Sequence, residues 1–447
     1  MTIEPRRLAT AAETAIAERF AARPTGGPAA LAARREDAYR AFERTGLPSR
    51  RVEAYRYTDL KAALRTLAPA PTGVAAAALS APWDFAGLAR HRIVFVDGRY
   101  AAALSDVSQL DGAVSVATFG SLIAAGDARA EAAGALVDRF PTPSADPIVQ
   151  LNTALFDDGA LITVAPGSTI TEPVAIVHVV TKAEPVSVHT RHVVTVAEGA
   201  TVRFIEHHVG PEGVAYQSDS LVELDIADGA KVVWVRLQEE GEAAIHLGGS
   251  AVRLGGKARL DSLSVVFGAQ LSRNQGFVTF AGPHSEAVFE TVSLLDGRRQ
   301  ADATLVVTHA VPDCISRERF RAVIDDAARS VVQGRIEVAK DAQHTDGRMM
   351  TQALIIGEEA ESINKPELEI FADDVQCAHG ATSGRLDDNA VFYLRSRGIP
   401  RHEAEALLLE AFLAESIEAF ADEAIAEVLS ERLRARLAQR RAREAVR

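Results

Sequence analysis

Residues 198–237 read EGATVRFIEHHVGPEGVAYQSDSLVELDIADGAKVVWVRL, and this stretch decides the fold. Residues 201–205 and 231–237 are rich in Val, Ile and Thr and alternate with polar side chains, which is typical of strands. Each run follows a similar glycine turn, Glu198-Gly199-Ala200 in one case and Asp228-Gly229-Ala230 in the other. The stretch therefore predicts two strands that are entered through the same kind of turn.

The same turn recurs on both sides of this stretch. Pro166-Gly167-Ser168 precedes it and Gly255-Gly256-Lys257 follows it, so the turn glycines lie about 26 to 32 residues apart. No helical pattern of roughly 10 to 15 residues separates the strands, which argues against a β/α-barrel or a doubly wound sheet. An antiparallel sandwich and a solenoid both remain. The long series of similar units favours the solenoid, in which each rung buries apolar side chains on its neighbours.

Helical patterns flank the strand-rich region. Ala, Glu and Arg dominate the first 65 or so residues, and the apolar spacing predicts helices near residues 8–19 and 31–45. Residues 69–82 are rich in Ala and Pro and predict a linker. We expect three regions: an N-terminal helical and mixed domain over residues 1–145, a strand core over 146–385 and a C-terminal helical domain over 386–447.

Composition excludes several classes of protein. The net charge of −13 argues against nucleic-acid binding, because phosphate contacts need clustered Lys and Arg. Two cysteines in 447 residues exclude a disulfide framework and suit a reducing compartment. The N-terminus lacks the apolar core of a signal peptide, and no apolar run approaches the roughly 18 residues of a membrane helix. We therefore expect a cytoplasmic protein.

The chain also lacks the common catalytic motifs. It contains no phosphate-binding G-x-x-x-x-G-K-[ST], no G-x-G-x-x-G after a strand and no G-x-S-x-G elbow. His402-Glu403 begins like a zinc-protease motif, but Ala406 stands where the second histidine would be. An enzyme acting alone would be expected to show at least one of these patterns, whereas a scaffold would not.

One stretch combines a thiol with an imidazole. Residues 365–400 read KPELEIFADDVQCAHGATSGRLDDNAVFYLRSRGIP, and Cys377 stands two residues before His379. With Gly380 and Gly384 beside them, these groups could form a small metal or sulfur site. Two residues do not complete such a site, so further ligands would come from elsewhere in the fold or from a partner. The alternative is that Cys377 is a small buried hydrophobic residue.

This stretch resembles the SufB/SufD family of iron–sulfur cluster assembly proteins, and the HGAT sequence after the cysteine resembles its SufD members. The matching residues there are KPELEI, ADDV, Cys377, HGAT, Gly384, LD and the later YLRSRGI. Tyr55 departs from the pattern, since it replaces the family's usual tryptophan. Further matching segments are Arg51-Val52-Glu53, Tyr57-Thr58-Asp59-Leu60, Asn152-Thr153-Ala154, Ser272-Arg273-Asn274 and Pro312-Asp313-Cys314-Ile315-Ser316.

The resemblance implies a fold and a role. The fold is a right-handed parallel β-helix core flanked by N-terminal and C-terminal helical regions. The role is that of a non-ATPase scaffold subunit of the SufBCD complex, on which nascent clusters form at the contact with a SufB-like subunit. His379 would offer an imidazole nitrogen to iron, and Cys377 a nearby thiolate.

The resemblance also sets expectations for cofactors and partners. We expect a transient Fe–S cluster or iron at the SufB contact and no cofactor bound tightly to the isolated chain. Whether a flavin binds the assembled complex stays open. The isolated chain would pair with itself as a homodimer when the SufB-like subunit is absent.

The C-terminal region carries an amphipathic stripe. Two interpretations stay open: the helices cap the open end of the solenoid, or they dock a SufC-like ATPase, as the resemblance implies. In the second case, ATP binding by the ATPase would move the scaffold chains and expose the cluster site. The stripe and candidate docking residues are Leu407, Leu408, Ala411 and Phe412, with Ala404.

Two other functions are alternatives. A stand-alone β-helix enzyme, such as a carbohydrate-active lyase, would need a row of carboxylates and basic residues along one face and usually a secretion signal. A self-paired binding protein would use the same sheet surface without SufB. Five histidines of the strand-rich region could line one face, although core-satisfied or exposed histidines are the usual explanation. They are His189, His192, His207, His208 and His246.

Overall fold

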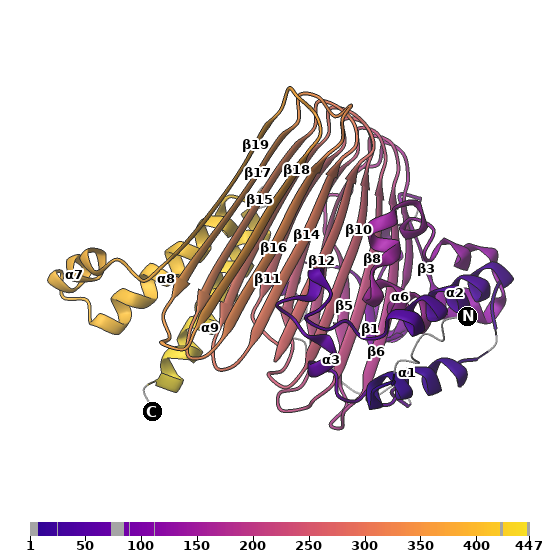
Figure 1. The fold of residues 1–447 in the computed structure, drawn as a ribbon, viewed down its shortest axis with the longest axis horizontal. Helices are drawn as coiled ribbons and strands as arrows, with labels where there is room; N and C mark the ends of the chain where they lie inside the picture. The colour runs from indigo at the N-terminus through magenta and orange to yellow at the C-terminus, as the bar shows by residue number, and fades with distance from the viewer. Residues whose placement is uncertain are drawn as a thin grey trace, which may run out of the picture.

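The protein forms a long column of parallel strands with helices beside it (Figure 1). This computed structural model describes residues 8–24, 26–72, 85–88, 90–110, 112–420 and 423–444. Most of the linker predicted over residues 69–82 lies outside the described residues.

Two sheets make up the column, one with 10 strands (sheet A) and one with 9 (sheet B) in the described part of the chain. Sheet A contains β1 (His91–Val96), β2 (Arg99–Tyr100), β5 (Val174–Val179), β7 (Thr201–Val209), β9 (Lys231–Glu239), β11 (Arg259–Val266), β13 (Glu286–Leu295), β15 (Ile315–Ile324), β17 (Asp346–Ile355) and β19 (Gln376–Gly384). Sheet B contains β3 (Val114–Thr118), β4 (Ala160–Val164), β6 (Ser187–Val196), β8 (Gln217–Ile226), β10 (Ile245–Leu254), β12 (Leu271–Phe280), β14 (Gln300–His309), β16 (Arg329–Val338) and β18 (Glu361–Ile370).

From β4 onward, successive strands alternate between the two sheets, so each rung contributes one strand to each. Strands of neighbouring rungs pair in parallel, with Thr201 opposite Lys231 and Lys231 opposite Arg259. The spacing of these partners matches that of the glycine turns. The solenoid prediction is confirmed, and the antiparallel sandwich is wrong.

The turns explain why glycine recurs. Gly167, Gly199 and Gly229 have φ of 65°, 66° and 67°, a left-handed conformation that is strained for most other residues. Within the strands, alternate side chains face the lumen between the two sheets. Phe204 and Trp234 occupy neighbouring rungs there, with ring centroids 5.0 Å apart. The lumen core is therefore a continuous stack of aligned side chains along the column.

The N-terminal helices cover the outer face of sheet B. Ile16 and Phe42 pack with Leu247 and Leu271 of that sheet in one buried cluster. The helices expected near residues 8–19 and 31–45 are confirmed, and β1 and β3 show that this region also supplies strands to both sheets. The helices are α1 (Ala11–Ala21), α2 (Ala29–Thr45), α3 (Leu60–Ala63), α4 (Phe119–Ala125), α5 (Pro141–Ala145) and α6 (Pro147–Leu155).

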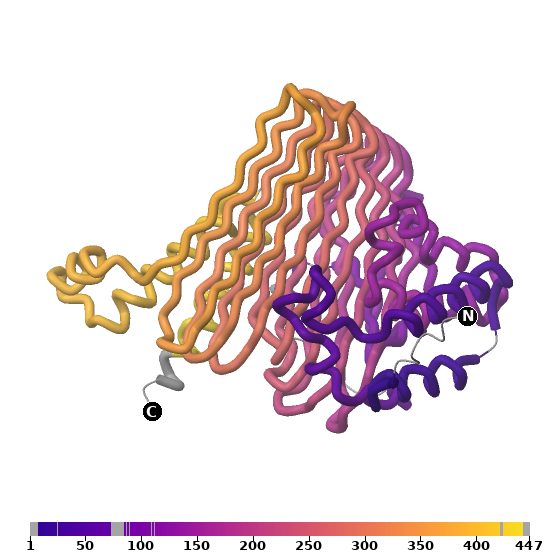
Figure 2. Tube along the Cα trace, in the orientation of Figure 1, coloured from indigo at the N-terminus to yellow at the C-terminus, as the bar shows by residue number. Residues whose placement is uncertain are grey.

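The C-terminal helices are α7 (Asp388–Ser396), α8 (Arg401–Glu418) and α9 (Glu423–Glu444), and they lie far from the N-terminal helices along the column (Figure 2). In α8, Leu409 and Leu413 pack with Val292 and Val323 on the outer face of sheet A. These helices cover a side of the solenoid, so the expectation that they cap its open end is wrong. Among the described residues, no helix combines the length and apolarity needed to cross a membrane.

The buried face of α8 differs from the predicted stripe. Leu407 is 47% exposed and Ala411 is exposed, whereas Leu408 and Phe412 are half-buried. Leu409 and Leu413, which the stripe omitted, are 1% and 0% exposed. Helical periodicity alone left the direction of the apolar face undecided, because Leu407, Leu408 and Leu409 are three successive leucines.

Candidate functional site

The last rung of the column is open in the described part of the chain. β18 pairs with β16 alone, and β19 pairs with β17 alone. The free edge of each strand presents backbone N–H and C=O groups that a further strand could pair with. Pro366, which has no N–H to donate, lies in β18, where an edge strand tolerates it. The last rung is therefore a surface on which another chain can settle.

Cys377 and His379 lie together on this rung. Cys377 is opposite Gly347 and His379 is opposite Met349, and Met349 is a buried member of the lumen core. Because side chains two residues apart share a face of a strand, the thiol and the imidazole both face the mouth of the lumen. Cys377 is half-buried against the core, whereas His379 is exposed. The structure thus brings the two predicted residues together at the open end.

The surroundings of Cys377 affect the reactivity of its thiol. Burial raises the pKa of the Cys377 thiol above its ordinary value, although a hydrogen bond from the Gly347 backbone works in the opposite direction. The neutral thiol therefore predominates until a cation or metal stabilises the thiolate. The second cysteine, Cys314, is 0% exposed and packs within the lumen core.

Neighbouring residues have structural roles. Asp387 caps α7, since its Oδ1 accepts a hydrogen bond of 2.8 Å from the backbone of Asn389. Lys365 on β18 lies 2.9 Å from the carboxylate of Glu53. This ion pair joins two sequence segments that carry the family resemblance but lie far apart in the chain.

The strand-rich histidines do not line one face. His207 and His208 are successive residues of β7, so they point to opposite faces of sheet A. His207 binds Glu239 at 3.1 Å, whereas His208 lies in the lumen and binds Glu206 at 3.0 Å. The interpretation that the five histidines line one face is therefore wrong, because strand residues alternate in direction. All five are buried, which agrees with the usual explanation of histidines held within the core.

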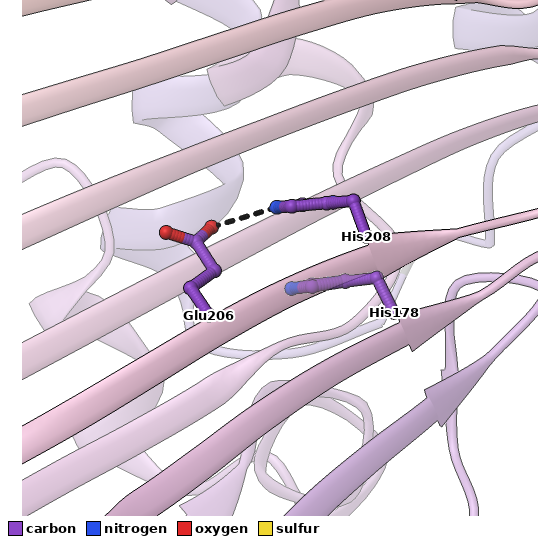
Figure 3. A group of neighbouring side chains, drawn as sticks. All are labelled: His178, Glu206 and His208. Atoms are coloured by element: carbon purple, nitrogen blue, oxygen red, sulfur yellow. Dashed lines mark hydrogen bonds and ion pairs between the residues drawn. The ribbon is translucent and has the colours of Figure 1, made fainter. Parts of the chain in front are cut away.

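A buried group of three side chains in the lumen was not predicted from the sequence. His178, Glu206 and His208 place their ligand atoms within 4.8 Å of one another (Figure 3). Two signals could have found them: Glu206 and His208 are two residues apart, and His178 precedes His208 by one rung. The first spacing places two side chains on one face, and the second places side chains on adjacent strands.

The fold and its open end define a class: a parallel β-helix protein with an imidazole and a thiol on a last rung that no described strand covers. Two family models match the chain, the SufBD protein N-terminal region over residues 24–176 and the SUF system FeS cluster assembly, SufBD core domain, over residues 178–412. The chain therefore belongs to the SufBD family of iron–sulfur cluster assembly proteins.

Relatives place it nearer to SufD. The chain is 31% identical over 408 residues to the iron–sulfur cluster assembly protein SufD of Escherichia coli (strain K12), which covers 89% of this chain and 90% of the relative. It is 28% identical over 385 residues to a SufBD family protein of Synechocystis, with 83% of each chain covered. A SufBD family protein of Mycobacterium tuberculosis is 29% identical over 271 residues, or 59% of this chain and 67% of the relative. The chain is SufD-like.

Proposed function

We propose that this protein is a non-ATPase scaffold subunit on which nascent iron–sulfur clusters form, at the contact between its last rung and a SufB-like partner. The observation that carries the proposal is the exposed imidazole of His379 beside the thiol of Cys377, on a strand whose outer edge is free in the described part of the chain.

The edge of the last rung supports a strand-to-strand contact with the partner. The free backbone groups of β18 and β19 favour pairing with strands of another chain. Large apolar side chains are exposed close by: Phe371 is 68% exposed and Met350 is 40% exposed. Such residues supply anchors that a partner would bury. Without that partner, the same edges would pair two copies of this chain.

Iron and sulfide are cargo in this proposal. The imidazole of His379 suits Fe(II), and the thiolate of Cys377 suits iron–sulfur species. His379 is the stronger candidate, because it is exposed whereas burial raises the pKa of the Cys377 thiol. The partner would supply the remaining ligands, since two residues do not complete a coordination shell.

Replacing His379 by Ala tests this role. We expect His379→Ala to reduce cluster formation by at least about tenfold in the reconstituted complex with SufB-like and SufC-like partners, because an iron ligand is lost. Cluster formation is followed by visible absorption, and assembly by size-exclusion chromatography. Thr382→Ala, on the exposed part of the same strand but its opposite face, is the matched control and should keep the wild-type yield. A wild-type yield from an intact His379→Ala complex would remove His379 from the mechanism.

We also propose that α8 docks the SufC-like ATPase, whose ATP binding would shift the paired scaffold chains. Leu407 and Ala411 support this role, because they are exposed and lie one helical turn apart. On the neighbouring helix α7, Phe392 is 72% exposed and Tyr393 is 57% exposed, which adds two exposed aromatic side chains. Leu408 and Phe412 serve docking less directly, since both are half-buried.

A charge on the exposed stripe tests docking. We expect Leu407→Glu to weaken capture of the ATPase by at least about tenfold and to leave the thermal unfolding midpoint unchanged, because surface substitutions have little effect on stability. Ala419→Glu adds the same charge at the exposed end of α8 and is the control. Phe412→Glu should instead destabilise the chain, since Phe412 packs against the sheet A cluster and under Arg321. Full ATPase capture by Leu407→Glu would exclude this face.

A further inference from the structure

We propose that the lumen of the β-helix contains a second site, which binds one divalent first-row transition-metal cation through His178, Glu206 and His208 (Figure 3). This site is separate from the cluster site proposed above. It also departs from the expectation that the isolated chain binds no metal tightly.

The β-helix itself brings the three side chains together. His178 on β5 and His208 on β7 are register partners, so their rings stack with centroids 4.3 Å apart and planes 3° from parallel. Glu206 lies two residues before His208 and shares its face of the strand. Both rings direct their nitrogen ends toward the side of the Glu206 carboxylate (Figure 3). Nitrogen and oxygen ligands lie about 2.0–2.2 Å from such a metal, so small side-chain rotations would close the group on an ion.

One of the proposed ligand atoms, on His178, makes no hydrogen bond in the fold. The Nε2 atom of His178 is buried and has no hydrogen-bond partner. A buried polar atom without a partner lowers stability, and an apolar ring would fit the same stack without that cost. Burial also lowers the pKa of His178 well below its ordinary value, so the ring is neutral and can offer a lone pair to a cation.

The carboxylate is held in place by a second layer of contacts. Its Oε2 accepts hydrogen bonds from Arg236 Nε at 2.9 Å and from Trp234 Nε1 at 3.1 Å. Its Oε1 is 3.0 Å from His208 Nε2, on the side of the two imidazoles. Such outer contacts are typical of metal sites, because they orient the ligands before the ion binds.

The size of the neighbouring space selects the kind of ligand. A cavity of about 10 Å³ lies beside the two imidazoles and is lined by His178, His208, Ser218 and Glu240, among others, whereas Glu206 does not line it. This volume is about the least that holds one water molecule, so an organic molecule does not fit there. Two imidazoles and one carboxylate form the donor set typical of Fe(II), and imidazole also suits Zn(II) and other first-row cations. A single metal ion is therefore the ligand that both size and chemistry favour.

The site cannot share an ion with the last rung. In sheet A, β5 and β19 are separated by seven strand-to-strand steps. At about 4.8 Å a step, His178 lies roughly 34 Å from His379. Variants of the two sites can therefore be tested independently, and failure of one proposal does not imply failure of the other.

The test is an anaerobic titration of the full-length chain with Co(II), followed by visible absorption, metal content and the thermal unfolding midpoint. We expect the wild type and His379→Ala to bind one lumen Co(II) per chain and to unfold at a higher temperature with it. His178→Phe should bind Co(II) at least about tenfold more weakly and lose the metal-dependent rise. It should fold normally, because a phenyl ring keeps the stacking on Phe95 and His208.

His309→Gln is the matched control. His309 is another buried lumen histidine, but it stacks on Phe280 and binds Ser316, with no ionisable neighbour that shifts its pKa. It should keep wild-type Co(II) binding. Absence of Co(II) binding by the wild type, or equal binding by His178→Phe, would overturn the proposal. If His178→Phe does not fold, His178→Gln replaces it and the same two outcomes decide.

Discussion

Arg191→Met is expected to lower the free energy of unfolding by about 3–5 kcal/mol, because it leaves the buried carboxylate of Glu223 without its cation. Both side chains are 0% exposed, and Arg191 Nη2 lies 2.8 Å from Glu223 Oε1. A charge in such surroundings cannot be solvated by water, so its partner decides whether the fold tolerates it.

The pair also joins the N-terminal region to sheet B. Glu223 on β8 accepts backbone hydrogen bonds from Gly134, Leu136 and Val137 at 2.6–3.1 Å. Arg191 on β6 donates to Thr153 Oγ1 of α6 at 2.8 Å. Loss of the guanidinium therefore disturbs the attachment of the helical cover as well as the ion pair.

The measurement is urea unfolding followed by circular dichroism and by tryptophan fluorescence. Arg253→Met is the matched control, because Arg253 also pairs with a carboxylate at 2.9 Å, but the two side chains are 24% and 30% exposed. Water solvates such a pair, so we expect a loss of about 0–1 kcal/mol. Equal losses for the two variants would contradict the argument from burial.

Glu318→Leu is expected to have the opposite effect and to raise the free energy of unfolding by about 1–3 kcal/mol at pH 7. Glu318 is 0% exposed, and neither of its carboxylate oxygens has a hydrogen-bond partner. Glu318 lies on β15 and faces the lumen. Its register partners are Phe289 on β13 and Met349 on β17, so it stands between two apolar side chains. An apolar side chain of similar size suits that column better than a carboxyl group.

The gain should depend on pH. Burial raises the pKa of Glu318 well above its ordinary value of 4.5. Well below pH 4.5 the carboxyl group is protonated in both states, so its charge has no effect on stability. As pH rises above 4.5, the unfolded chain ionises more readily than the folded one, and wild-type stability falls until the folded pKa is passed. The advantage of Glu318→Leu therefore grows from pH 4.5 upward.

Urea unfolding of Glu318→Leu and wild type between pH 4.5 and pH 8 checks this result. Glu318→Gln is the control, because it removes the charge but keeps an unpaired polar group in the lumen. Its gain in stability over the wild type should grow with pH as that of Glu318→Leu does, but it should be smaller at every pH. A gain from Glu318→Leu that is constant with pH would show that ionisation has no part in it.

The site was predictable in part. Cys377 and His379 stand out in the sequence because a thiol and an imidazole two residues apart share a face of any strand. That they face the mouth of a lumen, one half-buried and one exposed, depends on β19 being the last strand of its sheet. The group of His178, Glu206 and His208 was not predicted, because His178 and His208 are one rung apart in the sequence. Residues with that separation come into contact only when the solenoid forms.

By itself, the sequence determined the strands and turns of each rung and the number of residues after which they repeat. Turn glycines and alternating apolar residues act over a few neighbouring positions, so they predict strands, turns and their period without knowledge of the rest of the chain. Only the tertiary structure decided which faces the helices cover, which of three successive leucines in α8 is buried, and which charges lie in the lumen. These features depend on contacts between side chains of distant rungs and helices, which form only when the column is complete. Local sequence patterns do not predict such contacts.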